Sequence, residues 1–282
     1  MGFRFQSQGT VARAMTDQWT LNRLNFAGDW QGRGAWFGRD AAGRLDLASP
    51  NRVIDPTRYR ISFPDDDNGR WDGSGLMFAK GGHASYAISR ASYNAGGGCW
   101  QFQGAGGQSS LSLDPQRPRF GHEINLFSGR SRSMLVLLWQ WTDSHWCLHT
   151  VGAVAFRCRQ SMEMEQVRPV PDSAAALLEP LRGWRGTAEQ LRPQQGTDGR
   201  VRLLGSTTFA PEQLLRSSCS AVMPDGLVFS VPEELPGGAF QLEIGGLLSA
   251  ELFQQISIQV DADGRLITWE RRRFQNSLGR SS

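Results

Sequence analysis

The chain has 282 residues, of which 39% are hydrophobic and 20% are charged, so it is expected to fold rather than to stay disordered. This length suits one large domain or two ordinary ones. The formal net charge of +3, from 30 basic and 27 acidic residues, is too small a surplus to predict a nucleic-acid-binding protein.

The N-terminal stretch "MGFRFQSQGT" lacks the apolar core of a signal peptide, and the longest apolar run, Met134 to Trp139, is too short to span a bilayer. The cysteines lie far apart without Cys-x-x-Cys spacing, which predicts neither a zinc knuckle nor a disulfide scaffold. We therefore expect a cytoplasmic protein with no transmembrane segment.

Helical periodicity occurs in two places. From about Ala14 to Phe26, bulky side chains recur at spacings of four, four and three, which predicts an amphipathic helix. A second, shorter helix is predicted from Ser173 to Leu181, where "DSAAALLEPL" offers an Asp or Ser cap followed by Ala and Leu.

Most of the remaining chain alternates apolar and polar side chains, which is the period of a β-strand, between turns rich in glycine and proline. The clearest hairpin is predicted at 255–274, "QISIQVDADGRLITWERRRF". Another is predicted at 132–159, with its turn near Thr142 to Ser144. These patterns indicate an all-β fold.

A Trp-x-Gly sequence occurs twice, at Trp30 to Gly32 and at Trp184 to Gly186, each time directly after a predicted helix. The offset of 154 residues (184 − 30) is about the size of one small domain. The segment "EMEQVRPVPDS" carries two prolines and is interpreted as a linker. We predict two similar domains, at residues 10–163 and 172–274.

Aromatic residues are abundant, and Trp139, Trp141 and Trp146 crowd into one hairpin. Trp139 and Trp141 share a strand face with Leu137, so they are candidates for the lining of a cavity that holds a planar apolar ligand. The alternative is that they simply fill the interior of a barrel.

A binding site for a ligand with carboxylates is expected to contain arginines, because a guanidinium pairs with a carboxylate in a bidentate way. Tyr86 and Arg90 lie an even number of residues apart on one predicted strand, and Arg132 flanks the strand that bears Trp139, so these are candidate ligand-binding residues. Solvated strand ends are the alternative explanation. In the second half, Glu243 is a carboxylate inside an apolar strand and must be neutral, paired or used in binding.

His122 and Glu123, in "FGHEINLF", are candidates for a catalytic acid or base. In "SHWCLHT", His145, Cys147 and His149 alternate on one strand. Three ligands along a straight strand span roughly 13 Å, so at most two could share one metal ion, and no second ligand cluster is visible. We therefore predict no metal site, and no cofactor is required.

Gly28-Asp29-Trp30 matches the Gly-x-Trp signature of lipocalins and other calycins. The resemblance implies two lipocalin-like (calycin) antiparallel β-barrels in tandem, each preceded by a short helix. It also implies a basic residue of the last strand packed across each tryptophan. The candidates are Arg157 or Arg159 in the first half and Arg271 or Arg272 in the second.

The whole chain also resembles a cyanobacterial family of unknown function with two lipocalin-like halves. The matching phrases are "NFAGDWQGRGAWF", "LRGWRGT", "MPDGLVFSVPEELPGGAFQLEIGGLLSAELFQQI" and "GRLITWERRRF". The second half is distantly similar to the small bilin lyases, which attach linear tetrapyrroles to phycobiliproteins. Those lyases carry an arginine shortly after the opening tryptophan, where this chain has Gly34 and Ala188.

These observations together favour a protein that binds a small hydrophobic or tetrapyrrole (bilin-like) ligand, as a bilin chaperone or as a lyase acting on a phycobiliprotein subunit. In a lyase, the barrel would hold the bilin while His122 or Glu123 protonates it and a cysteine of the partner attacks. Two alternatives stay open. One is a ligand-free scaffold or assembly factor of the photosynthetic apparatus, and the other is an enzyme acting on a carotenoid or fatty acid.

Overall fold

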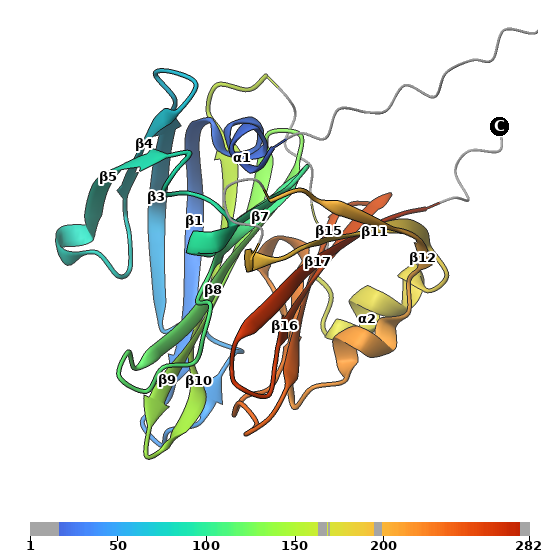
Figure 1. Ribbon diagram of the computed structural model, residues 1–282. Coiled ribbons are helices and arrows are strands. Elements are labelled where there is room, and N and C mark those ends of the chain that lie inside the picture. Colours follow the sequence, from blue (N-terminus) through green and yellow to red (C-terminus); the bar gives the residue numbers. More distant parts are fainter. Residues whose placement is uncertain (1–16, 163–167, 169, 195–198, 277–282) are drawn as a thin grey trace, which may run out of the picture.

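The computed structural model describes residues 17–162, 168, 170–194 and 199–276, and more than half of this part of the chain belongs to two antiparallel sheets (Figure 1). The first sheet has ten strands in the order β5-β4-β3-β1-β10-β9-β8-β7-β6, with β2 paired to β1. Its strands are β1 (Gly28–Arg39), β2 (Leu45–Asp46), β3 (Arg52–Ser62), β4 (Asn68–Ser74), β5 (His83–Ser89), β6 (Cys99–Phe102), β7 (Ala105–Ser109), β8 (Arg119–Ser128), β9 (Ser131–Thr142) and β10 (His145–Cys158).

The second sheet has seven strands in the order β12-β11-β17-β16-β15-β14-β13. The hairpins predicted at 132–159 and 255–274 are confirmed as β9–β10 and β16–β17. The strands of this sheet are β11 (Arg185–Leu191), β12 (Arg202–Thr208), β13 (Cys219–Met223), β14 (Leu227–Val231), β15 (Phe240–Ser249), β16 (Leu252–Val260) and β17 (Leu266–Gln275).

Both predicted helices are present where the sequence is described. Helix α1 (Gln18–Phe26) begins after Asp17, whose side chain accepts a hydrogen bond from the Thr20 backbone N–H at 2.7 Å. The N-terminal residues 14–16 of this prediction lie outside the described residues. Helix α2 (Ala174–Leu178) is capped by Ser173 and continues as a 3₁₀ turn, η3 (Glu179–Leu181). The other described 3₁₀ turns are η1 (Lys80–Gly82), η2 (Ala95–Gly97), η5 (Pro211–Leu215) and η6 (Pro224–Gly226).

The two Trp-x-Gly sequences have the same role in the two halves. In each half the strand that opens the sheet pairs with the strand that ends it, β1 with β10 and β11 with β17. Gly32 lies opposite Phe156 and Gly186 opposite Phe274, and a Cβ on either glycine would collide with a backbone carbonyl of the facing strand. The repeat in the sequence therefore reflects two sheets that are built alike.

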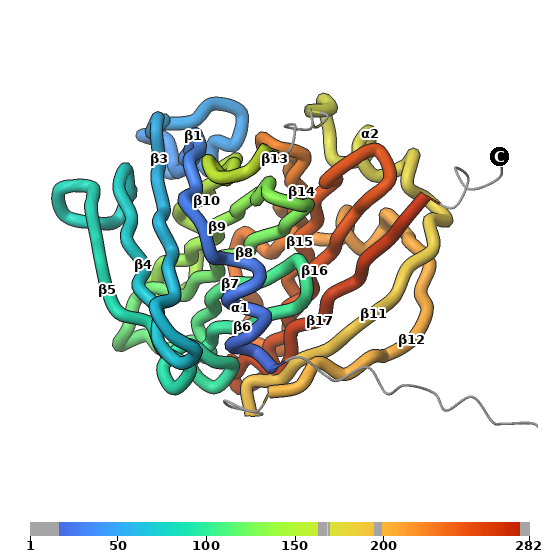
Figure 2. The backbone as a smooth tube through the Cα atoms, turned by 90° about the horizontal axis from the view of Figure 1, so that it is seen from above, coloured from blue at the N-terminus to red at the C-terminus, as the bar shows by residue number. Residues whose placement is uncertain are grey.

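Neither sheet closes on itself within the described residues, because no ladder joins β5 to β6 or β12 to β13. The sheets are curved and pack against each other instead (Figures 1 and 2). Apolar side chains from β6–β10 and from β13–β17 form one continuous core, in which Trp100 stacks on Trp269 with ring centroids 6.2 Å apart. The sequence predicts two closed barrels in tandem, whereas the structure shows two open curved sheets that share a core.

Two short backbone ladders also join the halves. At one end, Leu113 N–H donates to the carbonyl of Gly264 at 2.9 Å and Leu266 N–H to that of Leu111 at 2.8 Å. At the other end, β10 pairs with the segment that follows β14, where Leu148 N–H donates to the carbonyl of Glu233 at 2.7 Å. Residues 163–167 and 169 of the predicted linker lie outside the described residues.

A buried acid also connects the halves. Asp225 of η6, in the second half, binds Arg157 of β10 at 2.9 Å and Arg168 of the linker at 3.0 Å. Its backbone is left-handed, with φ 65°, and this conformation brings the carboxylate to the first sheet. Arg157 lies opposite Gln31 in the register of β1 and β10, so it is on the other face of the sheet from Trp30.

The indole of Trp30 lies in the apolar cluster on the inner side of the first sheet. It is completely buried, its Nε1 donates to the carbonyl of Phe26 at 2.8 Å, and the Arg130 guanidinium lies 4.6 Å from its ring centre. The cation thus comes from the turn between β8 and β9 and not from the last strand, where Arg159 pairs with Asp29 at 3.8 Å. In the second half, Arg271 lies over Phe102 of the first half, so the expected cation on Trp184 is not among the cation–ring contacts of the described residues.

The repeated glycines generate the first testable prediction. We expect Gly32→Ala and Gly186→Ala each to lower the free energy of unfolding by about 1–3 kcal/mol, because the new methyl group forces the facing strand outward. Gly237→Ala is the matched control, since a Cβ there meets open space, and it should change stability by less than about 0.5 kcal/mol. Urea unfolding of the three variants checks this. Equal stability of Gly186→Ala and Gly237→Ala would refute the close approach.

Candidate functional site

A small cavity lies inside the curve of the first sheet, on the face turned away from the second half. We call it the Arg132 cavity. Its volume is about 40 Å³, which holds about two or three water molecules. Its lining is contributed by α1, β3, β4, β5, β7, β8 and β9 and by the loop after β5. The lining residues are Asn22, Phe26, Ile61, Trp71, Tyr86, Ile88, Tyr93, Gln108, Glu123 and Arg132.

Arg132 is completely buried at one side of this cavity. Its Nε donates to Asn125 Oδ1 at 2.7 Å, and Nη2 lies 3.5 Å from Glu123 Oε1. Nη1 has no hydrogen-bond partner among the described residues. Burial lowers the pKa of the guanidinium, while the charge of Glu123 acts in the opposite direction. The site therefore contains a desolvated cation whose hydrogen bonds are incompletely used.

Aromatic rings surround this cation. The guanidinium carbon lies 4.8 Å from the ring centre of Phe156, 4.9 Å from that of Phe26 and 5.1 Å from that of Tyr59. Contacts of this kind are worth about 0.5–2 kcal/mol each when they are desolvated. They offset part of the cost of burial without using any of the N–H donors.

A row of aromatic rings in contact leads from the cation to the rim. Tyr59 packs on Phe156, Trp71 on Tyr59, and Tyr86 on Trp71, each pair with ring centroids 4.8 Å apart. Tyr86 is 42% exposed, whereas Tyr59 is buried. Burial raises the pKa of both phenols, so they stay neutral and can donate hydrogen bonds at ordinary pH. The site thus joins a charged interior to a flat aromatic rim.

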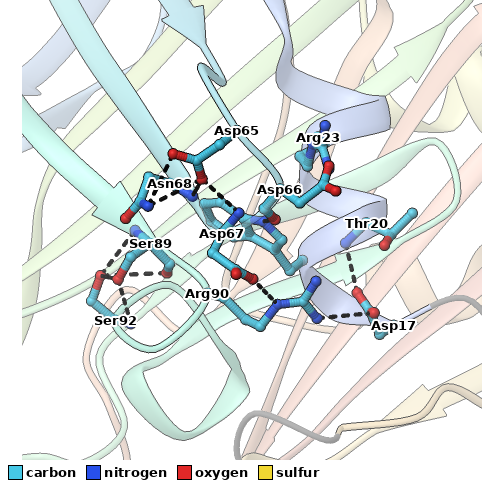
Figure 3. A network of polar contacts seen from close by, with 11 residues as sticks. Asp17, Thr20, Arg23, Asp65, Asp66, Asp67, Asn68, Ser89, Arg90 and Ser92 are labelled. Carbon is cyan, nitrogen blue, oxygen red and sulfur yellow. Dashed lines mark hydrogen bonds and ion pairs between the residues drawn. The ribbon is translucent and has the colours of Figure 1, made fainter.

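Three of the predicted site residues come together here, namely Tyr86, Glu123 and Arg132. Arg90 does not join them. It follows β5 at the surface, where it pairs with Asp17 at 3.0 Å and with Asp67 at 2.9 Å (Figure 3). Its role in the structure is to fasten the start of α1 to the turn before β4.

Trp139 and Trp141 lie on the opposite face of the first sheet from Arg132. Trp139 is completely buried in the shared core, and its Nε1 donates to the carbonyl of Pro232 in the second half at 3.1 Å. Trp141 is partly buried and packs on Trp146 at 5.4 Å. Because positions 132 and 139 differ by an odd number, strand alternation alone separates the two sets of side chains.

His122 and Glu123 are likewise separated by strand alternation. Glu123 faces the cavity, whereas His122 is buried in the shared core between Phe120 and Trp139, and neither ring nitrogen has a hydrogen-bond partner among the described residues. Burial lowers the pKa of the imidazole to about 3. The two side chains therefore cannot act as a pair on one ligand.

Glu243 belongs to the second sheet and is buried on its face away from the shared core. Its carboxylate accepts hydrogen bonds from Ser257 Oγ at 2.6 Å and from Gln255 Nε2 at 2.8 Å, and also from Gln241. Burial raises the pKa of this carboxyl group, while these donors act against the shift. Glu243 therefore has partners of its own and lies in a different half from the Arg132 cavity.

Sequence reasoning missed Trp71, Tyr93, Gln108 and Asn125. Gln108 lies directly opposite Glu123 in the register of β7 and β8, and its side chain donates to the hydroxyl of Tyr93. Strand parity identifies Asn125 as a neighbour of Glu123 on one face. The cross-strand partners depend on register, which the sequence alone does not supply.

No protein-family profile matches the chain, and no curated protein matches it. Among solved structures, the fold is similar to that of a protein of unknown function from the DUF3598 family of the cyanobacterium Nostoc punctiforme. The TM-score is 0.65 and the identity is 16%, over 93% of this chain and 100% of that one. A putative outer membrane protein from Bacteroides fragilis matches at 7% identity over 89% of this chain and 97% of that one. Its TM-score of 0.19 is too low to indicate a shared fold. The similarity to the Nostoc protein shows a shared all-β fold.

The search for helices able to cross a bilayer finds none in the described residues.

The buried imidazole generates a prediction of pH dependence. The unfolded chain protonates His122 below about pH 6.5, whereas the folded chain keeps it neutral down to a pKa of about 3. Stability is therefore lost as the pH falls through this window, by about 2 kcal/mol from this group at pH 5. Urea unfolding at pH 7.5 and pH 5 should show that His122→Leu loses about 2 kcal/mol less on acidification than the unchanged protein. The exposed His149→Ala is the control and should lose as much as the unchanged protein. An identical loss in His122→Leu would contradict the neutral, buried state.

Proposed function

We propose that the protein binds a small ligand with a flat apolar body and an acidic group, at the Arg132 cavity of the first half. A bilin-like tetrapyrrole is the class of ligand that the sequence resemblance implies, since its rings are flat and its propionates are acidic. The observation that carries the proposal is the buried guanidinium of Arg132, which lines a cavity and has a nitrogen, Nη1, without a hydrogen-bond partner among the described residues.

Burial of an arginine is costly, and it is tolerated where the charge is paired or used. Glu123 and Asn125 engage Nη2 and Nε, so the N–H groups of Nη1 remain for another acceptor. A ligand carboxylate suits this nitrogen, because a hydrogen bond from a cation to a carboxylate is stronger than one between neutral groups. The negative charge of Glu123 limits the site to one further acidic group.

The size of the cavity determines how much of the ligand enters it. Ligand pockets measure about 300–1,000 Å³, whereas the Arg132 cavity is about 40 Å³. Only the acidic group fits inside, and the flat body of the ligand would lie on Trp71 and Tyr86 at the rim. These two rings stack with an interplanar angle of 20°, which presents an aromatic surface at the entrance.

The wall that can yield to a larger ligand is the β4–β5 hairpin. Strand β5 is an edge of the sheet and pairs with β4 alone. Helix α1, by contrast, is fastened on both sides: Trp19 Nε1 donates to the carbonyl of Asp66 at 2.6 Å, and Asn25 donates to the carbonyl of Phe102 at 2.8 Å. Movement of the hairpin would widen the entrance without disturbing the core that the two sheets share.

The proposal is for binding and not for catalysis. The lyase mechanism needs an acid beside the ligand, and His122 lies on the other face of the sheet. Glu123 remains at the cavity but is already paired with Arg132. A carrier or chaperone of the ligand is therefore the form of the function that the geometry supports best.

The test is a titration of tag-free protein with biliverdin, followed by the visible absorption band and by quenching of tryptophan fluorescence. We expect saturable binding that weakens about tenfold to hundredfold in Arg132→Met, the loss expected for one charge-assisted hydrogen bond. Biliverdin dimethyl ester, which lacks the acidic groups, should bind the unchanged protein as weakly as biliverdin binds the variant. Arg90→Met removes an arginine outside the cavity and should leave the affinity unchanged.

Two results would overturn the proposal. The first is the absence of any spectral change with biliverdin, protoporphyrin IX or β-carotene, which would favour a scaffold whose interior is filled by its own side chains. The second is equal weakening in Arg132→Met and Arg90→Met, which would show that the affinity reflects overall charge. Melting temperatures of both variants establish that they are folded.

A further inference from the structure

Three metal-binding side chains meet where the start of β10 touches the second half. They are His145 and Cys147 of β10 and Glu234 of the segment between β14 and β15. One donor atom from each, an imidazole nitrogen, the thiol sulfur and a carboxylate oxygen, lies within 4.8 Å of the other two. This group is separate from the Arg132 cavity, because no residue belongs to both.

The backbone positions this group. His145 and Cys147 alternate on β10 and therefore point to the same side. Glu234 is brought to them by the ladder between the halves, in which it pairs directly with Cys147 and in which Leu235 N–H donates to the carbonyl of Trp146 at 3.0 Å. The third ligand is thus 87 residues (234 − 147) away in sequence, so inspection of β10 alone cannot find it.

His149, the third ligand candidate on the strand, does not take part. The pairing of β9 with β10 shifts between Leu148 and Thr150, and His149 Nδ1 lies 3.0 Å from the Thr150 hydroxyl. The irregularity thus interrupts the alternation that the sequence predicts for this residue.

The donor set selects the kind of metal. Thiolate, imidazole and carboxylate together suit Zn²⁺ or a similar first-row transition ion, whereas Ca²⁺ and Mg²⁺ require oxygen ligands. Tetrahedral zinc places its ligand atoms about 3.3–3.8 Å apart, so the group must contract by about 1 Å. Exposed side chains make such a contraction easy, and both His145 and Glu234 are exposed.

The surroundings favour a cation. His145 Nδ1 lies 3.0 Å from the carbonyl of Asp143, and an Nδ1–H donated to this oxygen leaves Nε2 as the ligand. The charge of Arg39 is balanced by Glu233, at 2.9 Å. Burial raises the pKa of the Cys147 thiol, the charge of Arg39 acts against this shift, and the neighbouring carboxylates add to it. A divalent ion would reverse this by displacing the thiol proton.

We propose that His145, Cys147 and Glu234 bind one Zn²⁺ or similar transition-metal ion, which ties the two halves of the protein together. On binding, the Cys147 thiol releases its proton to solvent and the thiolate sulfur coordinates the ion, while imidazole and carboxylate donate without change of charge. A water molecule completes the tetrahedron. The other three cysteines, Cys99, Cys158 and Cys219, are buried and take no part.

The experiment uses the full-length, tag-free protein after treatment with EDTA. Titration with Co²⁺ should give one ion per chain and a sulfur-to-cobalt charge-transfer band in the near ultraviolet, which Zn²⁺ then displaces. We expect Cys147→Ser to abolish the band, and His145→Ala and Glu234→Gln to weaken Zn²⁺ binding at least tenfold in competition with a chromophoric chelator. His149→Ala is the matched control, an exposed histidine of the same strand, and should bind as the unchanged protein does.

Thermal unfolding provides the second readout. Because the ion bridges the halves in the folded state alone, Zn²⁺ should raise the Tm of the unchanged protein and of His149→Ala but not that of Cys147→Ser. Absence of the charge-transfer band, its persistence in Cys147→Ser, or equal weakening in His149→Ala would overturn the proposal. None of these results depends on whether biliverdin binds.

Discussion

The apolar face shared by the two sheets is the constraint on which the other features depend. Side chains of β6–β10 and β13–β17 fill it, and it includes the stacked Trp100 and Trp269 and the edge-on pair Phe120 and Phe240. Burial of apolar surface is the main source of folding free energy, and here each sheet supplies the surface that the other covers. The second sheet therefore lies against the outer face of the first, and the two halves form one structural unit.

Because one face of the first sheet is used in this way, Glu123 and Arg132, which lie on the other face, point away from the second half. Along β9, Leu135, Leu137 and Trp139 face the shared core, whereas Arg132 and Met134 face the inside of the curve. A second, smaller cluster of aromatic residues occupies that inner side and surrounds Arg132. The charge is thus placed among rings and shielded from bulk solvent, which strengthens any interaction with an acidic ligand.

The boundary between the halves carries the other unusual chemistry. Loops of the second sheet place three groups against the first sheet. Asp225 lies beside Arg157, the Pro232 carbonyl accepts a hydrogen bond from Trp139, and Glu234 lies beside Cys147. Each of these contacts joins residues that are far apart in sequence. These contacts form only when the two halves are packed together, so any change in that packing would alter the contacts as well.

The sequence by itself determined the all-β class, the helices before Trp30 and Trp184, the two hairpins and the similarity of the halves. The helices and hairpins depend on local residue spacing. The similarity of the halves is visible in the repeated Trp-x-Gly motif, because Gly32 and Gly186 each allow the facing strand to approach closely. Arg132 and Trp139 are both predicted ligand-binding residues, although their odd spacing on one strand already places them on opposite faces. Only the tertiary structure decided that the sheets are open, that Arg130 covers Trp30, and that Tyr86, Glu123 and Arg132 meet in one cavity. It also decided that Glu234 lies beside Cys147. The reason is that register and packing between distant segments are set by burial of the whole apolar surface, which no local pattern encodes.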